Sequence, residues 1–188
     1  MEQFADRLTH YLLIRGYIET DQTEWCHYAI LHHAMDILSF CMLVLVGSCL
    51  VDWRAAVLFT LSFRFLRERT GGYHAKTPYG CLLVSLCVQF ASLTVVLYVP
   101  SCLFFGVIAV FSLCTVLKLA PSNNAFIHLT QDEINALRPA IRLRAVSILI
   151  CGCFCLLLSD TLWGGCLIAG LAADAVLLIL SACGLGVQ

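Results

Sequence analysis

The sequence predicts an all-α, polytopic integral membrane protein: a helical bundle of about six spans. Hydrophobic residues make up 61% of its 188 residues and charged residues only 12%. Soluble domains carry about 45–50% apolar and about 25% charged residues. The apolar residues also gather in runs close to the roughly 20 residues that a helix needs to cross the hydrocarbon core. A soluble fold would expose much of this apolar surface to water, so lipid is the expected solvent.

Six apolar runs are the predicted spans, and we expect four to six of them to cross the membrane. The second and fifth runs are short, so either could be tilted or re-entrant. We expect one membrane-embedded domain over residues 1–188, with polar loops at 64–80 and 118–144. The six runs are Ala34–Val51, Trp53–Leu66, Gly80–Val99, Cys102–Leu119, Ala145–Ser159 and Thr161–Leu185.

The distribution of lysine and arginine predicts the orientation. With six spans, Arg54 alone among the eleven basic residues falls on one side of the membrane, and the other ten fall on the opposite side. Basic residues concentrate in cytoplasmic segments. Both termini and both polar loops are therefore expected to be cytoplasmic. The ten residues are Arg7, Arg15, Arg64, Arg67, Arg69, Lys76, Lys118, Arg138, Arg142 and Arg144.

The N-terminal segment, residues 1–26, predicts an amphipathic helix rather than a cleavable signal peptide. Phe4, Leu8, Tyr11 and Leu12 recur at helical spacing, and charged residues interrupt any apolar core. We expect this helix to lie in the cytoplasmic interface of the bilayer. An ordinary helix packed on the bundle is the alternative.

Charge and cysteine content argue against two other classes. The net charge is -1 and there is no basic tail, so nothing indicates nucleic-acid binding. Twelve cysteines would suggest disulfides in a small secreted domain. Here most of them lie within apolar runs, where cysteine behaves as a small hydrophobe. We therefore expect reduced thiols.

The polar segment 64–80 holds the candidate chemistry. His74 supplies an imidazole that can change charge near neutral pH, and Cys81 directly follows the segment. Gly71 and Gly72 give the backbone freedom to bring the two together. The pair is a candidate general base and nucleophile. Spacing alone also leaves open a zinc site or a plain loop, although no second His/Cys pair with ligand spacing lies nearby.

Two further signals predict helix starts. Thr77 and Pro78 are typical of an N-cap followed by the first helical residue, which places Cys81 in the first turn. The amides at a helix N-terminus favour a thiolate there. Thr130 and Glu133 form a capping-box pattern, and Pro139 is expected to kink the helix that follows.

Other charged residues have competing interpretations. The three arginines at 64, 67 and 69 are topology anchors by default, and the alternative is that one of them holds an anionic substrate group. His32, His33 and Asp36 are interpreted as interfacial polar residues. Asp174 lies midway along the last run, where a charge is costly and often functional. If the protein is a non-enzymatic membrane protein, such as a transporter subunit, Asp174 is the better functional candidate.

The segment also carries a resemblance. The run Arg67-x-x-x-Gly71-Gly72-x-His74, with Cys81 seven residues later, resembles the signature of the accessory gene regulator B (AgrB) family. Members of this family are membrane cysteine endopeptidases that process quorum-sensing peptide precursors. Length, hydropathy and the order of elements match the family over essentially the whole chain.

A second stretch, 120–124 with the sequence APSNN, resembles the family as well, and so does the polar loop that follows it. Members often carry several lysines in that loop, where this chain has His128, Asp132 and Glu133. The departure concerns the identity of the precursor rather than the family.

The resemblance implies a role for each matching residue. Cys81 would be the nucleophile and His74 its general base, with no metal or cofactor required. Gly71 and Gly72 would shape the loop, and Arg67 would be an essential polar residue beside them. Candidates for a third residue that orients His74 are Asn123, Asn124 and Asp36.

The resemblance also implies a substrate and a product. The substrate would be a short, AgrD-like precursor peptide at the cytoplasmic face of the bacterial cell membrane. Attack by the thiolate would release the C-terminal tail and leave an acyl-enzyme thioester. A thiol or hydroxyl of the peptide could then close a thiolactone or lactone ring. Members of the family resemble one another in forming homodimers.

Overall fold

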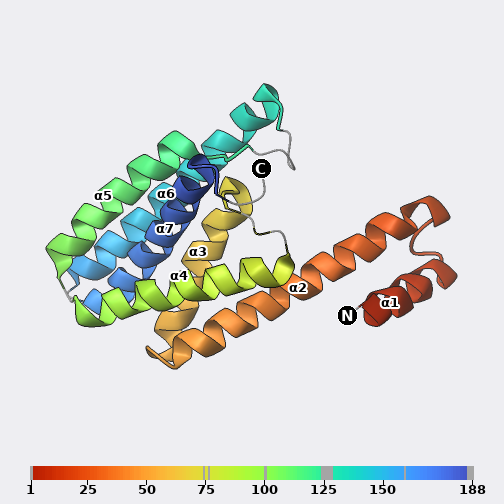
Figure 1. Cartoon of the computed structure of the whole chain (residues 1–188), viewed down its shortest axis with the longest axis horizontal. Coiled ribbons are helices and arrows are strands. Elements are labelled where there is room, and N and C mark those ends of the chain that lie inside the picture. Colours follow the sequence, from red (N-terminus) through yellow and green to blue (C-terminus); the bar gives the residue numbers. More distant parts are fainter. Residues whose placement is uncertain are drawn as a thin grey trace. The chain divides into compact units, whose positions relative to one another are not determined.

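The computed structural model describes residues 2–73, 75, 77–99, 101–123, 129–158 and 160–185. These residues form helices and connecting loops and contain no β-strand, so the predicted all-α class is confirmed (Figure 1). The chain divides into two units, Met1–Met42 and Leu43–Gln188. The helices are α1 (Glu2–Ile14), the 3-10 helix η1 (Thr20–Gln22), α2 (Thr23–Ser48), α3 (Trp53–Thr70), α4 (Pro78–Tyr98), α5 (Cys102–Leu119), α6 (Gln131–Leu157) and α7 (Thr161–Ala182).

Among the described residues, five helices are long and apolar enough to cross a bilayer: α2, α4, α5, α6 and α7. The polytopic membrane class is therefore confirmed, within the expected range of four to six spans. The remaining long helix, α3, has 18 residues, which corresponds to about 27 Å at 1.5 Å per residue. Its length suits a crossing, but Arg54 near its start and four charged residues in its last two turns keep it from meeting the apolar criterion.

Two helices extend well beyond the apolar runs that predict them. α2 begins at Thr23 rather than Ala34, and α6 begins at Gln131 rather than Ala145. The fifth run is therefore part of a longer helix. Arg138, Arg142 and Arg144 precede the apolar run, and the helix continues through them. The predicted capping box is confirmed: Thr130 and Glu133 exchange hydrogen bonds at the start of α6, and Pro139 lies inside this helix.

The core of the second unit is built around α7. This helix packs against α3, α4, α5 and α6, and Figure 1 shows it in blue between α5 and α3. It is the most deeply buried of the five candidate spans. Gly170 lets it approach α3 closely, because a Cβ there would meet the Phe59 oxygen and the Phe63 nitrogen, each 3.0 Å away. Small residues commonly permit such contacts between membrane helices.

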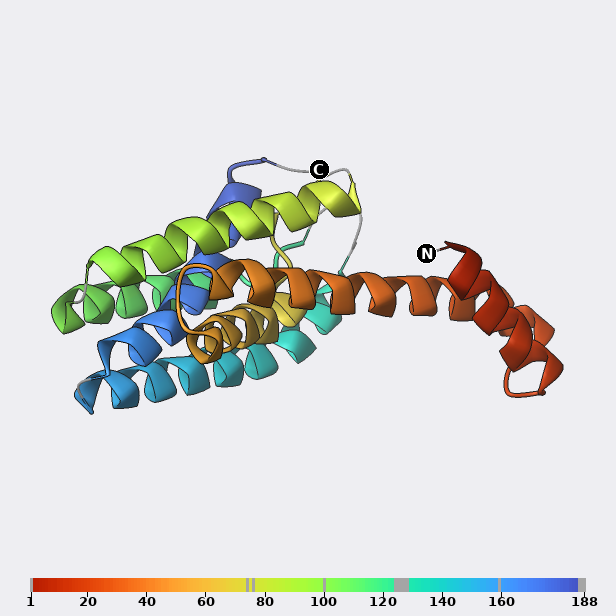
Figure 2. The same ribbon diagram turned by 90° about the horizontal axis from the view of Figure 1, so that it is seen from below.

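Apolar side chains also cover the outer faces of the helices around α7. Figure 2 shows α4 and α6 on opposite sides of α7. Exposed apolar side chains of this size suit contact with lipid chains rather than water. They include Leu83 and Phe90 of α4, Leu103, Val107 and Phe111 of α5, and Leu143, Ile150 and Phe154 of α6.

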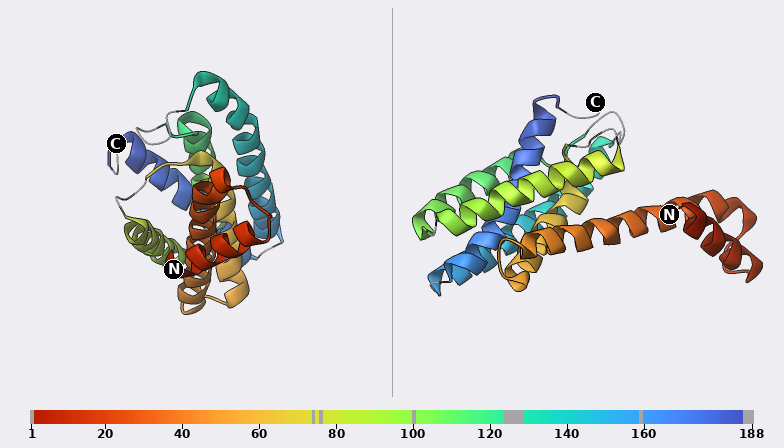
Figure 3. Two further views of the ribbon diagram at one scale, coloured as in Figure 1. Left: turned by 90° about the vertical axis from the view of Figure 1, so that its right-hand side faces the viewer. Right: turned by 60° about the horizontal axis from the view of Figure 1, so that its bottom comes forward.

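The first unit contains the predicted N-terminal helix. In this unit α1 lies beside the first turns of α2 (Figure 3), where the Asp6 carboxylate and the His27 imidazole are 3.0 Å apart. Ala5 and Thr9 are buried, whereas Phe4 is 61% exposed and Tyr11 50% exposed. An amphipathic helix with exposed aromatic side chains is compatible with the predicted position in the bilayer interface, which stays a prediction.

Candidate active site

The N-terminus of α4 positions Cys81. The hydroxyl of Thr77 caps the helix by accepting a hydrogen bond from the Gly80 amide over 3.1 Å. Pro78 is the first helical residue, where its missing amide hydrogen costs nothing. The Cys81 amide donates to the Thr77 carbonyl over 3.1 Å, within the first turn. The helix start predicted at Thr77 is therefore confirmed.

The sulfur of Cys81 has a backbone donor beside it. The Ala75 amide lies 3.1 Å from Sγ, and Sγ lies 3.9 Å from the Ala75 carbonyl oxygen. An N–H aimed at a sulfur favours negative charge on it. His74, the predicted general base, lies outside the described residues. None of the twelve cysteines, all of them in the described part of the chain, forms a disulfide, as expected.

Cys81 opens onto a small pocket of about 80 Å³. Its lining contains both polar and apolar side chains, so it can contact polar and apolar groups of a peptide. Its lining residues come from α3, the loop after it, α4 and α7, and they are Arg67, Tyr73, Cys81, Val84, Ser85 and Leu177.

Arg67 holds the loop that precedes Cys81. Its Nη1 donates to the Gly71 carbonyl and its Nη2 to the Tyr73 carbonyl, so one guanidinium bridges two backbone groups. The planar fork of arginine suits such a bridge. Burial lowers the pKa of the Arg67 guanidinium, while negative charge on Asp174 and on Cys81 opposes this shift. Arg67 and the Cys81 thiol line the same pocket.

Backbone geometry explains why glycine occupies both positions after α3. Gly71 has a φ of +68° and Gly72 a φ of +101°, a range that side-chain-bearing residues rarely adopt. A Cβ on Gly72 would also meet Nη1 of Arg67 at 2.5 Å and the Leu177 oxygen at 3.3 Å. Gly72 thus passes between the guanidinium and α7 with no room for a side chain.

The second half of α7 anchors this loop. The hydroxyl of Thr70, the final residue of α3, donates to Oδ1 of Asp174 over 2.9 Å. The Tyr73 amide donates to the Leu177 carbonyl over 3.1 Å. Asp174 and Leu177 are three residues apart, on one face of the helix. This face therefore fixes both ends of the turn that contains the two glycines.

The second stretch that resembles the family, residues 120–124, contacts the end of α3 through Ser122. The Ser122 amide donates to the Thr70 carbonyl over 2.8 Å, and the hydroxyls of Ser122 and Ser181 are 2.9 Å apart. Asn123 exchanges hydrogen bonds with the backbone of Leu129 at 3.0 and 2.9 Å. The fold thus brings together the two stretches that carry the resemblance, while Asn124 and His128 lie outside the described residues.

The arginines of α3 differ in their surroundings. Arg67 lines the pocket, Arg64 is half-buried and Arg69 is exposed. From α6, Arg144 reaches α3, where Nη1 lies 2.5 Å from the Phe65 carbonyl oxygen and 3.3 Å from the Glu68 carboxylate. The basic ends of α3 and α6 therefore meet at the end of the bundle that contains Cys81.

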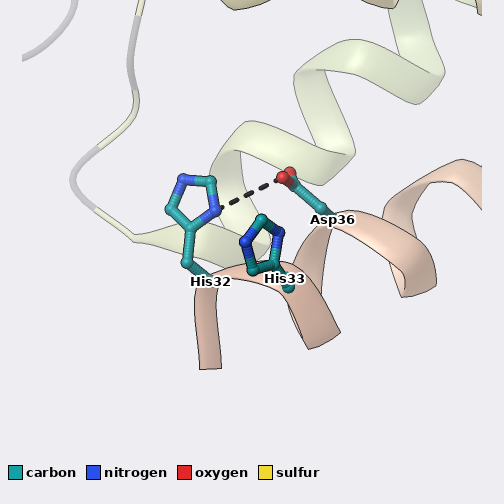
Figure 4. Close-up of side chains that lie close together, drawn as sticks. All are labelled: His32, His33 and Asp36. Carbon is teal, nitrogen blue, oxygen red and sulfur yellow. Dashed lines mark ion pairs between the residues drawn. The ribbon is translucent and has the colours of Figure 1, made fainter. Parts of the chain in front are cut away.

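A separate cluster of donor side chains lies in the first unit. His32, His33 and Asp36 project from adjacent positions on α2 (Figure 4), and Nδ1 of His32 is 3.3 Å from Oδ2 of Asp36. One ligand atom from each of the three lies within 4.8 Å of the others. Both histidines are exposed. These residue types can bind divalent transition metals. From the sequence alone they are interpreted as interfacial polar residues.

Sequence reasoning singles out Asp174 but misses Thr70, Tyr73 and Ser85. A signal for Thr70 is present in the sequence: a hydroxyl residue ends α3 just before the glycine pair. A carboxylate midway along an apolar helix needs a polar partner, and the pairing follows only from the way α3 packs against α7. Ser85 shares the pocket because it lies four residues, about one helical turn, after Cys81.

Comparison with known proteins identifies the family of this chain. The family model described as Accessory gene regulator B matches residues 2–181. The protein FsrB of Enterococcus faecalis is 22% identical over 140 residues, which cover 72% of this chain and 57% of FsrB's own length. No solved structure matches the chain. Because the family model covers nearly all of the sequence, the chain belongs to the accessory gene regulator B family.

Proposed function

We propose that this protein is a cysteine endopeptidase of the bacterial cell membrane that processes a quorum-sensing precursor peptide. Membership of the family supports a role in peptide processing. The observation that carries the cysteine mechanism is the placement of Cys81: its sulfur lies beside the Ala75 amide and lines a pocket together with Arg67. A nucleophile needs such a combination of access and nearby positive charge.

The first chemical step is acyl transfer to Cys81. His74 takes the thiol proton, and the thiolate forms a C–S bond with a backbone carbonyl carbon of the precursor. The C–N bond of that peptide group then breaks, and His74 delivers the proton to the departing amine. The C-terminal tail leaves, and the remaining peptide is bound to Cys81 as a thioester.

The second step releases the product. A thiol or hydroxyl within the bound peptide attacks the thioester carbon, the C–S bond to Cys81 breaks, and the nucleophile's proton returns to the Cys81 sulfur through His74. The product is a thiolactone or a lactone. Because a thioester keeps the acyl group activated, exchange to a thiolactone needs no further energy source. If water attacks instead, the product is a linear peptide.

The pocket supplies two groups that suit this chemistry. Arg67 provides fixed positive charge next to the thiol, which favours the negative charge of a thiolate and of a tetrahedral intermediate. Ser85 places a hydroxyl in the same pocket, where it can donate to the substrate carbonyl. The apolar side chains of Val84 and Leu177 would face the peptide's own apolar groups.

The proposal includes location and assembly. The clustering of basic residues from α3 and α6 at the Cys81 end supports a cytoplasmic site. The protein would act there on its peptide substrate as a homodimer, which chemical cross-linking in membranes can test.

The experiment that tests the function is co-expression with an AgrD-like precursor peptide, followed by mass spectrometry. The wild type should yield a cleaved peptide and a hydroxylamine-sensitive adduct on Cys81. Cys81→Ala and Cys81→Ser should give neither product at unchanged levels of inserted protein. Cys87→Ala, an exposed thiol on the same helix, is the matched control and should cleave normally. Cleavage by Cys81→Ala would overturn the mechanism.

A further inference from the structure

Asp174 is a buried carboxylate in the middle of α7. Its exposed fraction is 0%. Oδ1 accepts the hydrogen bond from Thr70, while Oδ2 is buried and has no hydrogen-bond partner among the described residues. A buried charge without compensation costs several kcal/mol. A carboxylate in this position therefore needs a reason beyond the packing of α7.

The positively charged side chain that interacts with Asp174 is Arg67. The Asp174 carboxylate acts electrostatically on the Arg67 guanidinium, which is itself half-buried. Thr70 follows Arg67 by three residues, so both side chains lie on the same face at the end of α3. The Thr70 hydroxyl also lies 3.2 Å from the Leu66 carbonyl, which keeps it directed along the helix. Asp174 is thus joined to the end of α3 by the hydrogen bond with Thr70.

The consequence reaches the pocket through the loop. Arg67 binds the Gly71 and Tyr73 carbonyls, and the Tyr73 amide binds the Leu177 carbonyl one turn beyond Asp174. If the end of α3 shifts, the guanidinium and the loop shift with it. Three of the six pocket-lining residues, Arg67, Tyr73 and Leu177, belong to this arrangement.

We propose that Asp174 is a positioning residue for the Cys81 site. It fixes the end of α3, and with it Arg67 and the loop 71–73, through its hydrogen bond with Thr70. The cleavage readout of this inference rests on the proposed peptidase function. Asp174 would thereby support the nucleophile Cys81 without touching the substrate.

Four variants separate positioning from packing. Thr70→Val keeps the shape of the side chain and removes the donor, whereas Thr70→Ser keeps the donor and removes a methyl group. Asp174→Asn keeps an oxygen that can accept from Thr70 and removes the charge. Asp160→Asn is the matched control, because Asp160 caps the opposite end of the same helix through the Trp163 amide at 3.0 Å.

Two measurements on the full-length protein in detergent test the proposal. The first is steady-state cleavage of the precursor. Asp174→Asn and Thr70→Val should each lower kcat at least tenfold with KM changed less than about twofold, while Thr70→Ser and Asp160→Asn stay near wild type. The second is hydrogen exchange of the Tyr73 amide, which should become at least tenfold faster in Asp174→Asn and stay unchanged in Asp160→Asn.

The outcomes separate this inference from the proposed function. Equal activities of Thr70→Val and the wild type, or a Tyr73 amide that exchanges at the wild-type rate in Asp174→Asn, would overturn the positioning role. If the loss in the double variant Asp174→Asn/Thr70→Val equals or exceeds the product of the two single losses, the residues do not act through one shared contact, and the role is likewise rejected. If the wild type does not cleave, the peptidase function fails, and the exchange of Tyr73 still decides the role of Asp174.

Discussion

The backbone amide of Ala75 points at the sulfur of Cys81 from 3.1 Å. The contact joins the last part of the glycine loop to the first turn of α4, so the loop and the thiol are held as one unit. An N–H donor at this distance stabilises a thiolate more than a thiol. Reactivity of Cys81 should therefore depend on the residues that shape the loop as well as on its own helix.

The first prediction concerns His74. His74→Ala should abolish precursor cleavage and slow the alkylation of Cys81 by iodoacetamide at neutral pH, because the base that favours the thiolate is lost. Site-resolved mass spectrometry measures the alkylation, and Cys87 in the same sample provides the reference rate. Lost cleavage with unchanged alkylation would instead assign His74 to substrate binding, and retained cleavage would remove it from the mechanism.

The second prediction distinguishes the two glycines. Gly72→Ala should lose more activity than Gly71→Ala, because both changes strain a positive φ by about 1–3 kcal/mol, but only the Cβ at position 72 also displaces the Arg67 guanidinium. A Cβ at position 71 would have its nearest contact at 3.4 Å, the oxygen of Ser122. The measurement is cleaved peptide per inserted enzyme for both variants. A larger loss in Gly71→Ala would contradict the close contact between Gly72 and the Arg67 guanidinium.

Hydropathy and capping patterns predict most of the fold. The start of α4 at Thr77 and the start of α6 at Thr130 follow from local hydrogen bonding, which depends on a few adjacent residues. The start of α2 at Thr23 does not follow, because its first turns are polar and hydropathy measures contact with lipid rather than helix formation. Apolar runs therefore locate the membrane crossings better than they locate the helix ends.

The candidate site is less predictable than the fold. The glycines, Arg67 and Cys81 lie within fifteen residues of one another, so their association is visible in the sequence. The contact between Thr70 and Asp174 joins positions 104 residues apart, and it forms because α3 and α7 pack against each other. Contacts of this kind depend on helix packing, which a periodicity argument does not specify.

The third prediction concerns metals. EDTA should leave cleavage unchanged, because neither the thiolate attack nor the ring closure uses a metal ion. The double variant His32→Ala/His33→Ala is the matched control, since these residues carry the exposed donor cluster of α2. It should cleave at the wild-type rate with and without EDTA. Inhibition by EDTA that added zinc reverses would favour a metalloprotease, and its disappearance in the double variant would locate the metal.

The fourth prediction concerns topology. Single cysteines in a cysteine-free background should be accessible from the cytoplasm at positions in the Arg69–Thr77 and Pro121–Thr130 segments, and from outside at positions beside Asp52 and Asp160. The reason is that α3 and α6 bring their basic ends together at the Cys81 end of the bundle. Membrane-impermeant maleimide applied to intact cells and to inverted vesicles measures the sidedness. External labelling of the Pro121–Thr130 segment would overturn the six-span arrangement.

The last prediction concerns Arg67. If arginines 64, 67 and 69 acted only as topology anchors, lysine would replace each of them, because the positive-inside bias depends on charge. The structure separates Arg67 from the other two: its two terminal nitrogens bind two different carbonyls, those of Gly71 and Tyr73. An ammonium group lacks this planar fork and cannot hold both carbonyls in the same way.

We therefore expect Arg67→Lys to impair cleavage strongly at unchanged insertion, and Arg64→Lys and Arg69→Lys to have mild effects. A lost hydrogen bond to a charged group costs about 1.5–3 kcal/mol, which corresponds to a roughly ten- to hundredfold lower rate if the transition state bears the whole loss. The measurement is the yield of cleaved peptide, normalised to membrane-inserted enzyme, for all three lysine variants. Arg69→Lys is the sharpest control, because Arg69 is exposed two residues further along the same helix. Equal, near-wild-type yields would reduce all three arginines to topology anchors and leave the proposed His74–Cys81 pair without a supporting arginine.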